Sequence, residues 1–480
     1  MAGWEVNKMK HKHVVRGISM ILCGVMLISC FGCGLENRKV DVQPNENVVI
    51  EPMEIEDVDT YGFDFLGGTD VMPILGYYGP APSTVSLNGV AVPDYVNDEI
   101  FQMISECGVN LMAYFPIDYK NASEYFHKIL ELGEKYNVGV TVTDSRISEN
   151  DELTLSKVDE CVKDYRDYPA FCGVFGVDEP TTATYPGKQP NISVFADKIN
   201  LLAELGIWSY GNLLPCGDVN KRDAYNDYIE EWLSTCNVKM LLYDYYVHDS
   251  DTNEKYFYHL SLMREKAAKY DVPFWVFVQA GGQWNDSQNY FDSEPLYPSE
   301  GEFMWNVNTA LAYGAKGLAY FPLIQPYHFA YAESTPYDFE RNGLIGASGN
   351  KNRWWYYAKN ANAQITAVDE VLMNAVNKGV IITSKQAKAD NKDSNCIIDG
   401  KAWRELINVK GDAMVGCFNY QGKSAYYIVN YDMECAQNIT MDFYDNCNFT
   451  VTQNAEKKAF QGNSMELTMK PGEGVLVVME

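Results

Sequence analysis

Short apolar runs alternate with amphipathic stretches along the chain from about residue 61 to residue 325. The runs have the length of β-strands buried on both faces, and the stretches between them have helical periodicity. In residues 122–136, for example, Phe126, Ile129 and Leu130 share one helix face, and in residues 194–205 Ile199 and Leu202 do so. Strand starts recur roughly every 35 residues, the size of one βα unit. The predicted strands are 71–78, 110–117, 138–144, 171–178, 208–214, 239–244, 273–279 and 317–323.

This alternation predicts the fold class. Strands that alternate with helices favour a parallel sheet, and eight such units favour closure into a (β/α)8 barrel over an open sheet. No GxGxxG sequence follows the first strand, which argues further against dinucleotide binding. After about Gly379 the pattern changes to short alternating strands, such as 413–418, 424–430 and 474–478, separated by turn sequences. We therefore predict an α/β fold, with a TIM barrel over residues 61–378 and a small antiparallel β-sandwich over residues 379–480.

The first residues have the pattern of an export signal. A basic stretch precedes an apolar segment from about Ile18 to Ile28, which is short for a membrane-spanning helix. The sequence Leu27-Ile28-Ser29-Cys30 resembles a bacterial lipoprotein signal. The resemblance implies a signal peptide over residues 1–29, lipidation of Cys30, a disordered tether over residues 30–60, and a protein anchored at the cell surface. Cys33 fits the pattern less well, and an uncleaved anchor is the alternative.

Charge and cysteine spacing restrict the ligands. A formal net charge of -27 argues against a polyanionic partner, so nucleic acid is excluded. The 12 cysteines are scattered, with no CxxC pair outside the signal region and no His at metal-binding spacing. We expect neither a metal site nor a cofactor. The apolar neighbours of Cys172 and Cys417 indicate packed free thiols, and no GxSxG sequence supports esterase or peptidase chemistry.

The first catalytic candidate is the triplet Asp178-Glu179-Pro180. It follows the apolar run 171–177 directly, and catalytic groups of (β/α)8 barrels project from the carboxyl ends of the strands. Cleavage of a glycosidic bond needs a proton on the leaving oxygen and stabilisation of an oxocarbenium-like centre, and two carboxyl groups can divide those roles. Adjacent strand residues point to opposite sides, so Asp178 and Glu179 can both face a substrate only if the chain turns at Val177-Asp178. A loop turn whose acids cap the next helix is the alternative.

These features together resemble the bacterial (β/α)8 glycoside hydrolases. The barrel, the carboxy-terminal β-sandwich, the carboxylate-Pro triplet and the sequence 313–317 before the eighth strand carry the resemblance, which spans residues 65–480. It is nearest to the clan A type, whose fourth strand ends in Asn-Glu and supplies the general acid/base. The resemblance implies that Glu179 is the acid/base and that Asp178 stands in the place of the Asn.

The seventh strand departs from this family pattern. The clan places its nucleophilic Glu there, whereas this strand ends in Gln279, which cannot replace it. Three alternatives stay open. The second carboxylate could be Asp244 at the end of the sixth strand, or the substrate could assist, as in the hexosaminidases that pair Asp with Glu on strand four. The third alternative is a loop carboxylate: Asp286, Glu294, Glu300 or Glu302.

Polar and aromatic residues at the other strand ends are candidates for binding the substrate. They are Tyr77, Tyr114, Asp144, Asn212, Tyr243, Gln279, Trp284 and Tyr320. The sequence thus predicts an exported, lipid-anchored glycoside hydrolase that cleaves O-glycosidic bonds of an oligo- or polysaccharide. The rival interpretation is a carbohydrate-binding lipoprotein that keeps the barrel but lacks the nucleophile.

Overall fold

The computed structural model describes residues 62–82, 86–87, 90–91, 93–116, 122–148, 152–183, 185, 191–248, 253–282, 298–325 and 342–480. The predicted signal peptide, Cys30 and the predicted tether lie outside these residues. Within them, no helix is long and apolar enough to cross a membrane.

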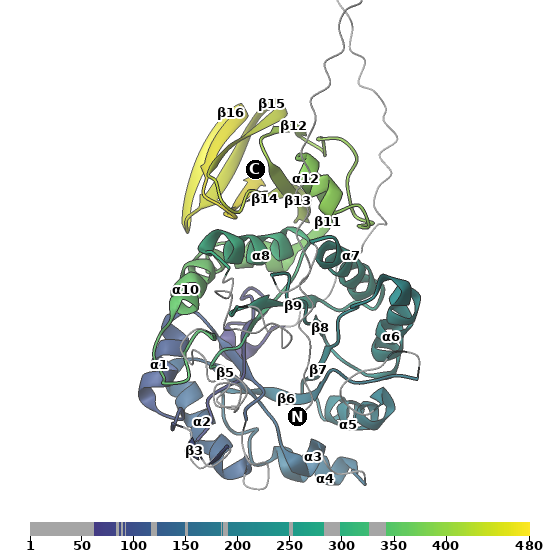
Figure 1. Cartoon of the computed structure of the whole chain (residues 1–480), viewed down its shortest axis with the longest axis vertical. Coiled ribbons are helices and arrows are strands. Elements are labelled where there is room, and N and C mark those ends of the chain that lie inside the picture. The colour runs from purple at the N-terminus through teal and green to yellow at the C-terminus, as the bar shows by residue number, and fades with distance from the viewer. Residues whose placement is uncertain are drawn as a thin grey trace, which may run out of the picture. The chain divides into compact units, whose positions relative to one another are not determined.

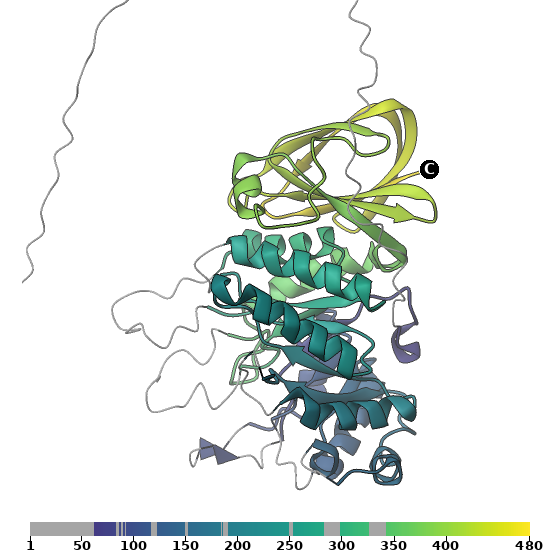
Figure 2. The same ribbon diagram turned by 90° about the vertical axis from the view of Figure 1, so that its right-hand side faces the viewer.

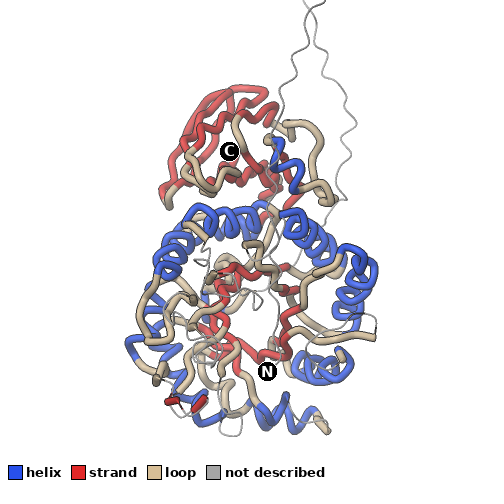
Figure 3. The backbone as a smooth tube through the Cα atoms, viewed as in Figure 1, coloured by secondary structure: helices blue, strands red, loops and turns tan. Residues whose placement is uncertain are grey.

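The predicted barrel is confirmed. Eight parallel strands close in the order β1-β10-β9-β8-β7-β6-β5-β4, and in Figure 3 they form a red ring inside a ring of blue helices. Each predicted strand contributes one barrel strand. These are β1 (Ile74–Tyr77), β4 (Leu111–Ala113), β5 (Gly139–Val142), β6 (Phe171–Asp178), β7 (Ser209–Leu213), β8 (Leu241–Tyr243), β9 (Phe274–Gln279) and β10 (Leu318–Phe321).

The main helices follow the strands in sequence and surround the barrel (Figure 1). Two begin and end at residues whose local chemistry explains the boundary. The first turn of α8 is held by a capping box between Ser299 and Glu302, and α2 ends before Asn137, which has the left-handed φ of 55°. The helices of this region are α1 (Asp98–Glu106), α2 (Ala122–Tyr136), α3 (Ser145–Ser148), α4 (Leu155–Val162), α5 (Ile192–Glu204), α6 (Arg222–Thr235), α7 (Asn253–Lys269), α8 (Glu300–Ala312), α10 (Arg353–Thr366) and α11 (Asp369–Asn374).

A separate antiparallel sheet follows, as predicted, and it begins at Ala375, slightly before the predicted boundary at residue 379. Its order is β11-β13-β14-β17-β15-β12, with β16 paired to β15. The long hairpin of β15 and β16 is the yellow end of the ribbon in Figure 2. The predicted turn at Gln421-Gly422 joins β13 to β14, and both residues have positive φ. The strands are β11 (Ala375–Ile382), β12 (Leu406–Lys410), β13 (Ala413–Tyr420), β14 (Lys423–Asn430), β15 (Gln437–Gln453), β16 (Glu456–Met469) and β17 (Gly474–Met479), and α12 (Lys385–Asp390) follows β11.

Side chains along each barrel strand point alternately to the barrel interior and to the helices, and they form two buried layers. One cluster fills the barrel interior and includes Leu75, Phe175, Leu242 and Phe277. The other joins the outer face of the strands to the helices, and Val177 belongs to it. Because successive strand residues face opposite sides, the parity of a residue decides whether its side chain reaches the barrel mouth or the helix layer.

Candidate functional site

Three adjacent strands, β6, β7 and β8, bring Asp178, Asn212 and Asp244 together at their carboxyl ends. The Nδ2 atom of Asn212 donates to Oδ1 of Asp178 at 3.0 Å and to Oδ1 of Asp244 at 3.3 Å. Asp244 and Asn212 are only 6% and 4% exposed, whereas Asp178 is half-buried. The structure therefore unites two of the predicted catalytic carboxylates through one predicted binding residue.

Glu179 joins this group through a distortion of β6. The pairing of β6 with β7 shifts register between Phe175 and Val177, and Glu179 has a left-handed φ of 48°. Its N–H donates to the Asn212 carbonyl at 2.8 Å, and its side chain is buried. The left-handed residue is thus Glu179, whereas the sequence placed the required turn at Val177-Asp178. Such backbone strain is concentrated at functional sites, because surrounding contacts must hold it in place.

Besides burial, the negative charges of Glu179 and Asp244 both raise the pKa of the Tyr228 hydroxyl. Tyr228, on α6, has a pKa raised chiefly by burial and further by the negative charges of Asp244 and Glu179. Its hydroxyl accepts the Leu214 N–H at 3.3 Å. Glu179 and Asp244 therefore lie on the same side of the site, toward the helix that carries Tyr228.

Aromatic rings line the barrel mouth beside Asp178. Tyr77 and Tyr114 stack with ring centroids 4.9 Å apart and an interplanar angle of 12°. Burial raises the pKa of both phenols, and the negative charge of Asp178 raises both further. Tyr78 and Tyr114 have left-handed φ values of 75° and 52°, which turn the chain where β1 and β4 end. Further rings in contact with this pair or with one another are Phe175, Tyr246, Phe277 and Phe321.

Gln279, at the end of β9, is held by the following loop. Its Nε2 donates to the carbonyls of Gly281 at 3.2 Å and Gly282 at 3.4 Å, while its Oε1 accepts the His248 N–H at 3.2 Å. It faces the interior side of β9, as Phe277 does, and is 1% exposed. The amide thus holds the backbone of the loop that follows β9.

Three predicted binding residues lie away from the barrel mouth. Asp144 accepts hydrogen bonds from Arg146 Nη2 at 2.6 Å and from the Tyr165 hydroxyl at 2.7 Å, between β5 and the helices. Tyr243 is wholly buried and stacks on His259 of α7. Tyr320 donates to Asn362 Oδ1 of α10 at 2.6 Å. All three residues have the parity that faces the helix layer, so the structure does not bring them together with Asp178 and Asn212.

The loop carboxylates divide into two groups. Asp286, Glu294 and also Trp284 lie outside the described residues. Glu302 accepts the Ser299 N–H at 2.6 Å within the α8 cap, and Glu300 accepts from Asn360 of α10 at 3.0 Å. Helix capping therefore occupies Glu302, and a side-chain contact with α10 occupies Glu300. Glu302 also lies near His248, whose pKa burial lowers to about 4 against the opposing effect of that carboxylate.

Sequence reasoning missed several residues of the mouth. Thr143, not Asp144, has the inward parity on β5, and it is 6% exposed. Tyr78, Tyr246 and Phe321 are half-buried members of the aromatic group. The signal for Thr143 was present in the alternation, since Val140 and Val142 pack outward.

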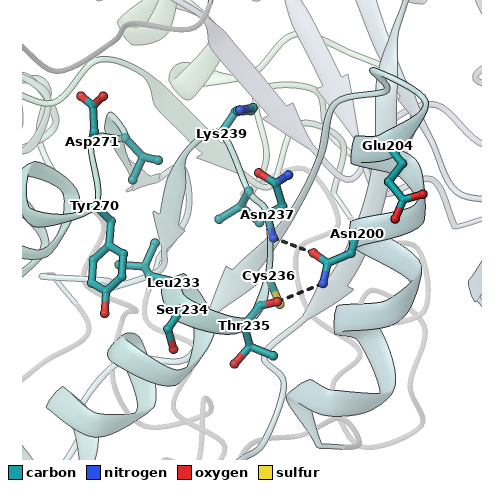
Figure 4. A pocket seen from close by; sticks show the side chains of 12 residues that line it. Asn200, Glu204, Leu233, Ser234, Thr235, Cys236, Asn237, Lys239, Tyr270 and Asp271 are labelled. Carbon is teal, nitrogen blue, oxygen red and sulfur yellow. Dashed lines mark hydrogen bonds between the residues drawn. The ribbon is translucent and has the colours of Figure 1, made fainter.

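An open pocket of about 800 Å³ lies at the opposite ends of the strands. It is lined by residues at the ends of α5, α6 and α7 and by Lys239, which precedes β8. Figure 4 shows Asn200 within it, which donates to the Thr235 carbonyl at 3.0 Å and accepts the Asn237 N–H at 2.7 Å. None of the predicted site residues lines this pocket. Across the described ranges, no group of three or more His, Cys, Asp or Glu side chains could hold a metal ion.

Solved structures share this architecture. A β-galactosidase from Bacillus circulans sp. alkalophilus matches with a TM-score of 0.56 and 9% identity, over 85% of this chain and 99% of its own. A catalytic mutant of Gan42B, a GH42 β-galactosidase from G. stearothermophilus, matches with a TM-score of 0.55 and 8% identity, over 86% and 98%. The chain thus shares a (β/α)8 barrel fold with these two enzymes. No protein-family model and no curated protein sequence matches it.

Proposed function

We propose that the protein is a glycoside hydrolase that cleaves O-glycosidic bonds of an oligo- or polysaccharide outside the cell. One observation carries the proposal. Two carboxylates, Asp178 and Asp244, share the amide nitrogen of Asn212, and the buried Glu179 follows Asp178 directly at the same rim. Three acids at the carboxyl end of barrel strands supply the two functions that glycoside cleavage needs, proton transfer and stabilisation of positive charge.

The roles follow from position. Glu179 is the general acid/base, which protonates the leaving oxygen and later activates water. Asp244 is the second carboxylate. It follows β8, and the Asn212 amide nitrogen joins it to Asp178. Asp178 orients the substrate beside Tyr77 and Tyr114.

The aromatic mouth supports a sugar as the ligand. Stacked and half-buried tyrosine rings offer apolar faces for the C–H side of a sugar ring, while carboxylates and an amide bind its hydroxyl groups. Because two barrels of the same fold are named β-galactosidases, β-galactosides are the first substrates to test.

The experiment compares the wild-type chain with Glu179→Gln on 4-nitrophenyl β-galactoside, β-glucoside and α-fucoside and on plant and microbial oligosaccharides. Loss of the proton donor should lower kcat/KM on the oligosaccharides by at least about a hundredfold, and by less on the 4-nitrophenyl glycosides, whose phenolate can leave unprotonated. Asp244→Asn should inactivate toward both. Glu204→Gln, an exposed acid in the pocket at the other end of the barrel, is the matched control. Full activity in a folded Glu179→Gln variant would disprove the assignment.

Gln279 favours one alternative, a carbohydrate-binding protein without turnover. The end of β9 carries a buried amide where clan A hydrolases have their nucleophile. If the wild-type chain binds an oligosaccharide by calorimetry yet releases no product over many equivalents, this alternative replaces the hydrolase.

The proposal also places the protein at the cell surface through a lipid on Cys30. Leu27-Ile28-Ser29-Cys30 supports this location. Labelling of growing cells with palmitate should mark the wild-type chain and the Cys33→Ala variant, but not Cys30→Ala. Label retained in Cys30→Ala would contradict the anchor.

A further inference from the structure

The side chain of Asn212 is held in one orientation. Its single nitrogen faces carboxylate oxygens of both Asp178 and Asp244. Rotation of the amide by 180° would replace this nitrogen with an oxygen, which would then repel both acids. The two acids therefore determine which way the amide points, and its Oδ1 is directed away from them.

Asn212 Oδ1 is left as an acceptor without a donor. It is buried, and among the described residues no group donates a hydrogen bond to it. Buried polar atoms are nearly always paired, so an inward-facing acceptor at the mouth of the barrel points to a donor that the described residues do not supply. The hydroxyl of Thr143, which has the inward-facing parity just after β5, is also buried without a partner in the described part of the chain.

We propose that Asn212 is a positioning and specificity-determining residue: its Oδ1 accepts a hydrogen bond from one sugar hydroxyl, while its Nδ2 aligns Asp178 with Asp244. The inference rests on the proposed hydrolase function. It requires a donor at that point of the sugar, so a substrate with a hydrogen or fluorine in place of the hydroxyl loses the contact. Because the amide cannot flip, Asn212 cannot offer a donor to such a substrate instead.

The experiment uses the 4-nitrophenyl glycoside that the wild-type chain cleaves fastest. It also uses the analogues in which each sugar hydroxyl in turn is replaced by hydrogen or by fluorine. Removal of one particular hydroxyl should lower the wild-type kcat/KM by at least about tenfold. In Asn212→Ala, the parent glycoside and that same analogue should be cleaved at nearly equal rates. A substitution that only disturbed folding would lower all rates together and preserve the discrimination.

Asn200→Ala is the matched control, because this amide is also hydrogen-bonded but lies in the pocket at the far end of the barrel. It should keep the wild-type activity and discrimination. If Asn212→Ala keeps the wild-type discrimination against every analogue, the inference is overturned while the hydrolase function stands. If the wild-type chain cleaves no glycoside, the proposed function itself has failed, and this inference falls with it.

Discussion

At the residue scale, His259 makes the stability of the fold sensitive to acid. Its ring is wholly buried, its Nδ1–H donates to the Lys255 carbonyl at 2.6 Å, and its Nε2 accepts the Cys216 N–H at 2.8 Å. The second contact requires the neutral ring, because a protonated Nε2 cannot accept the Cys216 N–H. Burial lowers the pKa of His259 to about 4 from the ordinary value of 6.5, so the unfolded chain binds a proton at a higher pH than the folded chain does.

The sign of the effect follows directly. The stabilisation is fully present above pH 6.5 and is lost as the pH falls from 6.5 to about 4. We expect the free energy of unfolding to drop by roughly 3 kcal/mol from this group across that window. Urea titrations of the wild-type chain and His259→Gln at several pH values test this. The difference between them should shrink toward pH 4, and a constant difference would contradict the mechanism.

The sequence predicts where each barrel strand ends, but apolar runs alone do not tell which residues at that end face the barrel interior. Apolar runs located the strand ends, which is why Asp178, Asn212 and Asp244 were found. Apolar runs alone do not exclude Asp144 and Tyr243, whose side chains face the helices, because the side of the strand depends on alternation and not on nearness to the strand end. The left-handed turns at Tyr78, Tyr114 and Glu179 have no sequence signal, since none of these residues is Gly.

At the element scale, the path of β6 depends on a glycine that precedes the acids. Gly173 has a φ of 146°, and a Cβ added there would lie 2.3 Å from the Trp208 carbonyl oxygen of the neighbouring strand region. Gly206 also has a positive φ, of 70°, but open space surrounds the position of its Cβ. Alanine at Gly206 would therefore add backbone strain alone, whereas alanine at Gly173 would add both backbone strain and a steric clash.

We expect Gly173→Ala to lower the free energy of unfolding by about 3 kcal/mol and Gly206→Ala by about 1 kcal/mol. Gly173→Ala should also reduce glycoside turnover, because a displaced β6 would move Asp178 at its end and Glu179 directly after it. Chemical denaturation and kcat/KM of both variants test the point. Equal destabilisation by the two substitutions would show that contact with β7 does not restrict β6.

The elements themselves were predictable because buried parallel strands leave long apolar runs. Each of the eight predicted runs contains one barrel strand, and Gln421-Gly422 fixes the β13–β14 turn. The register shift within β6 was not predictable, since it arises from pairing with β7 and not from the local sequence.

At the scale of the whole molecule, buried polar contacts join the barrel to the antiparallel sheet. Asn308 of α8 donates to the Gly472 carbonyl at 2.8 Å and accepts the Tyr427 hydroxyl at 2.7 Å. Arg264 of α7 donates to Asn377 Oδ1 at 2.7 Å and to its carbonyl at 2.9 Å. These groups are almost inaccessible to water, so separation of the barrel from the sheet would leave them to be solvated or unpaired.

We therefore expect the barrel and the sheet to unfold in one cooperative transition. Asn308→Ala removes a donor and an acceptor at once and leaves the Gly472 carbonyl and the Tyr427 hydroxyl buried. It should lower the free energy of unfolding by about 2 kcal/mol while the transition stays single. Asn360→Ala, which removes an exposed amide from α10, should change stability by less than about 0.5 kcal/mol. Calorimetry decides the matter: two resolved transitions in the wild-type chain, or a sheet that melts alone in Asn308→Ala, would show that the sheet is an independent module and not a support for α8.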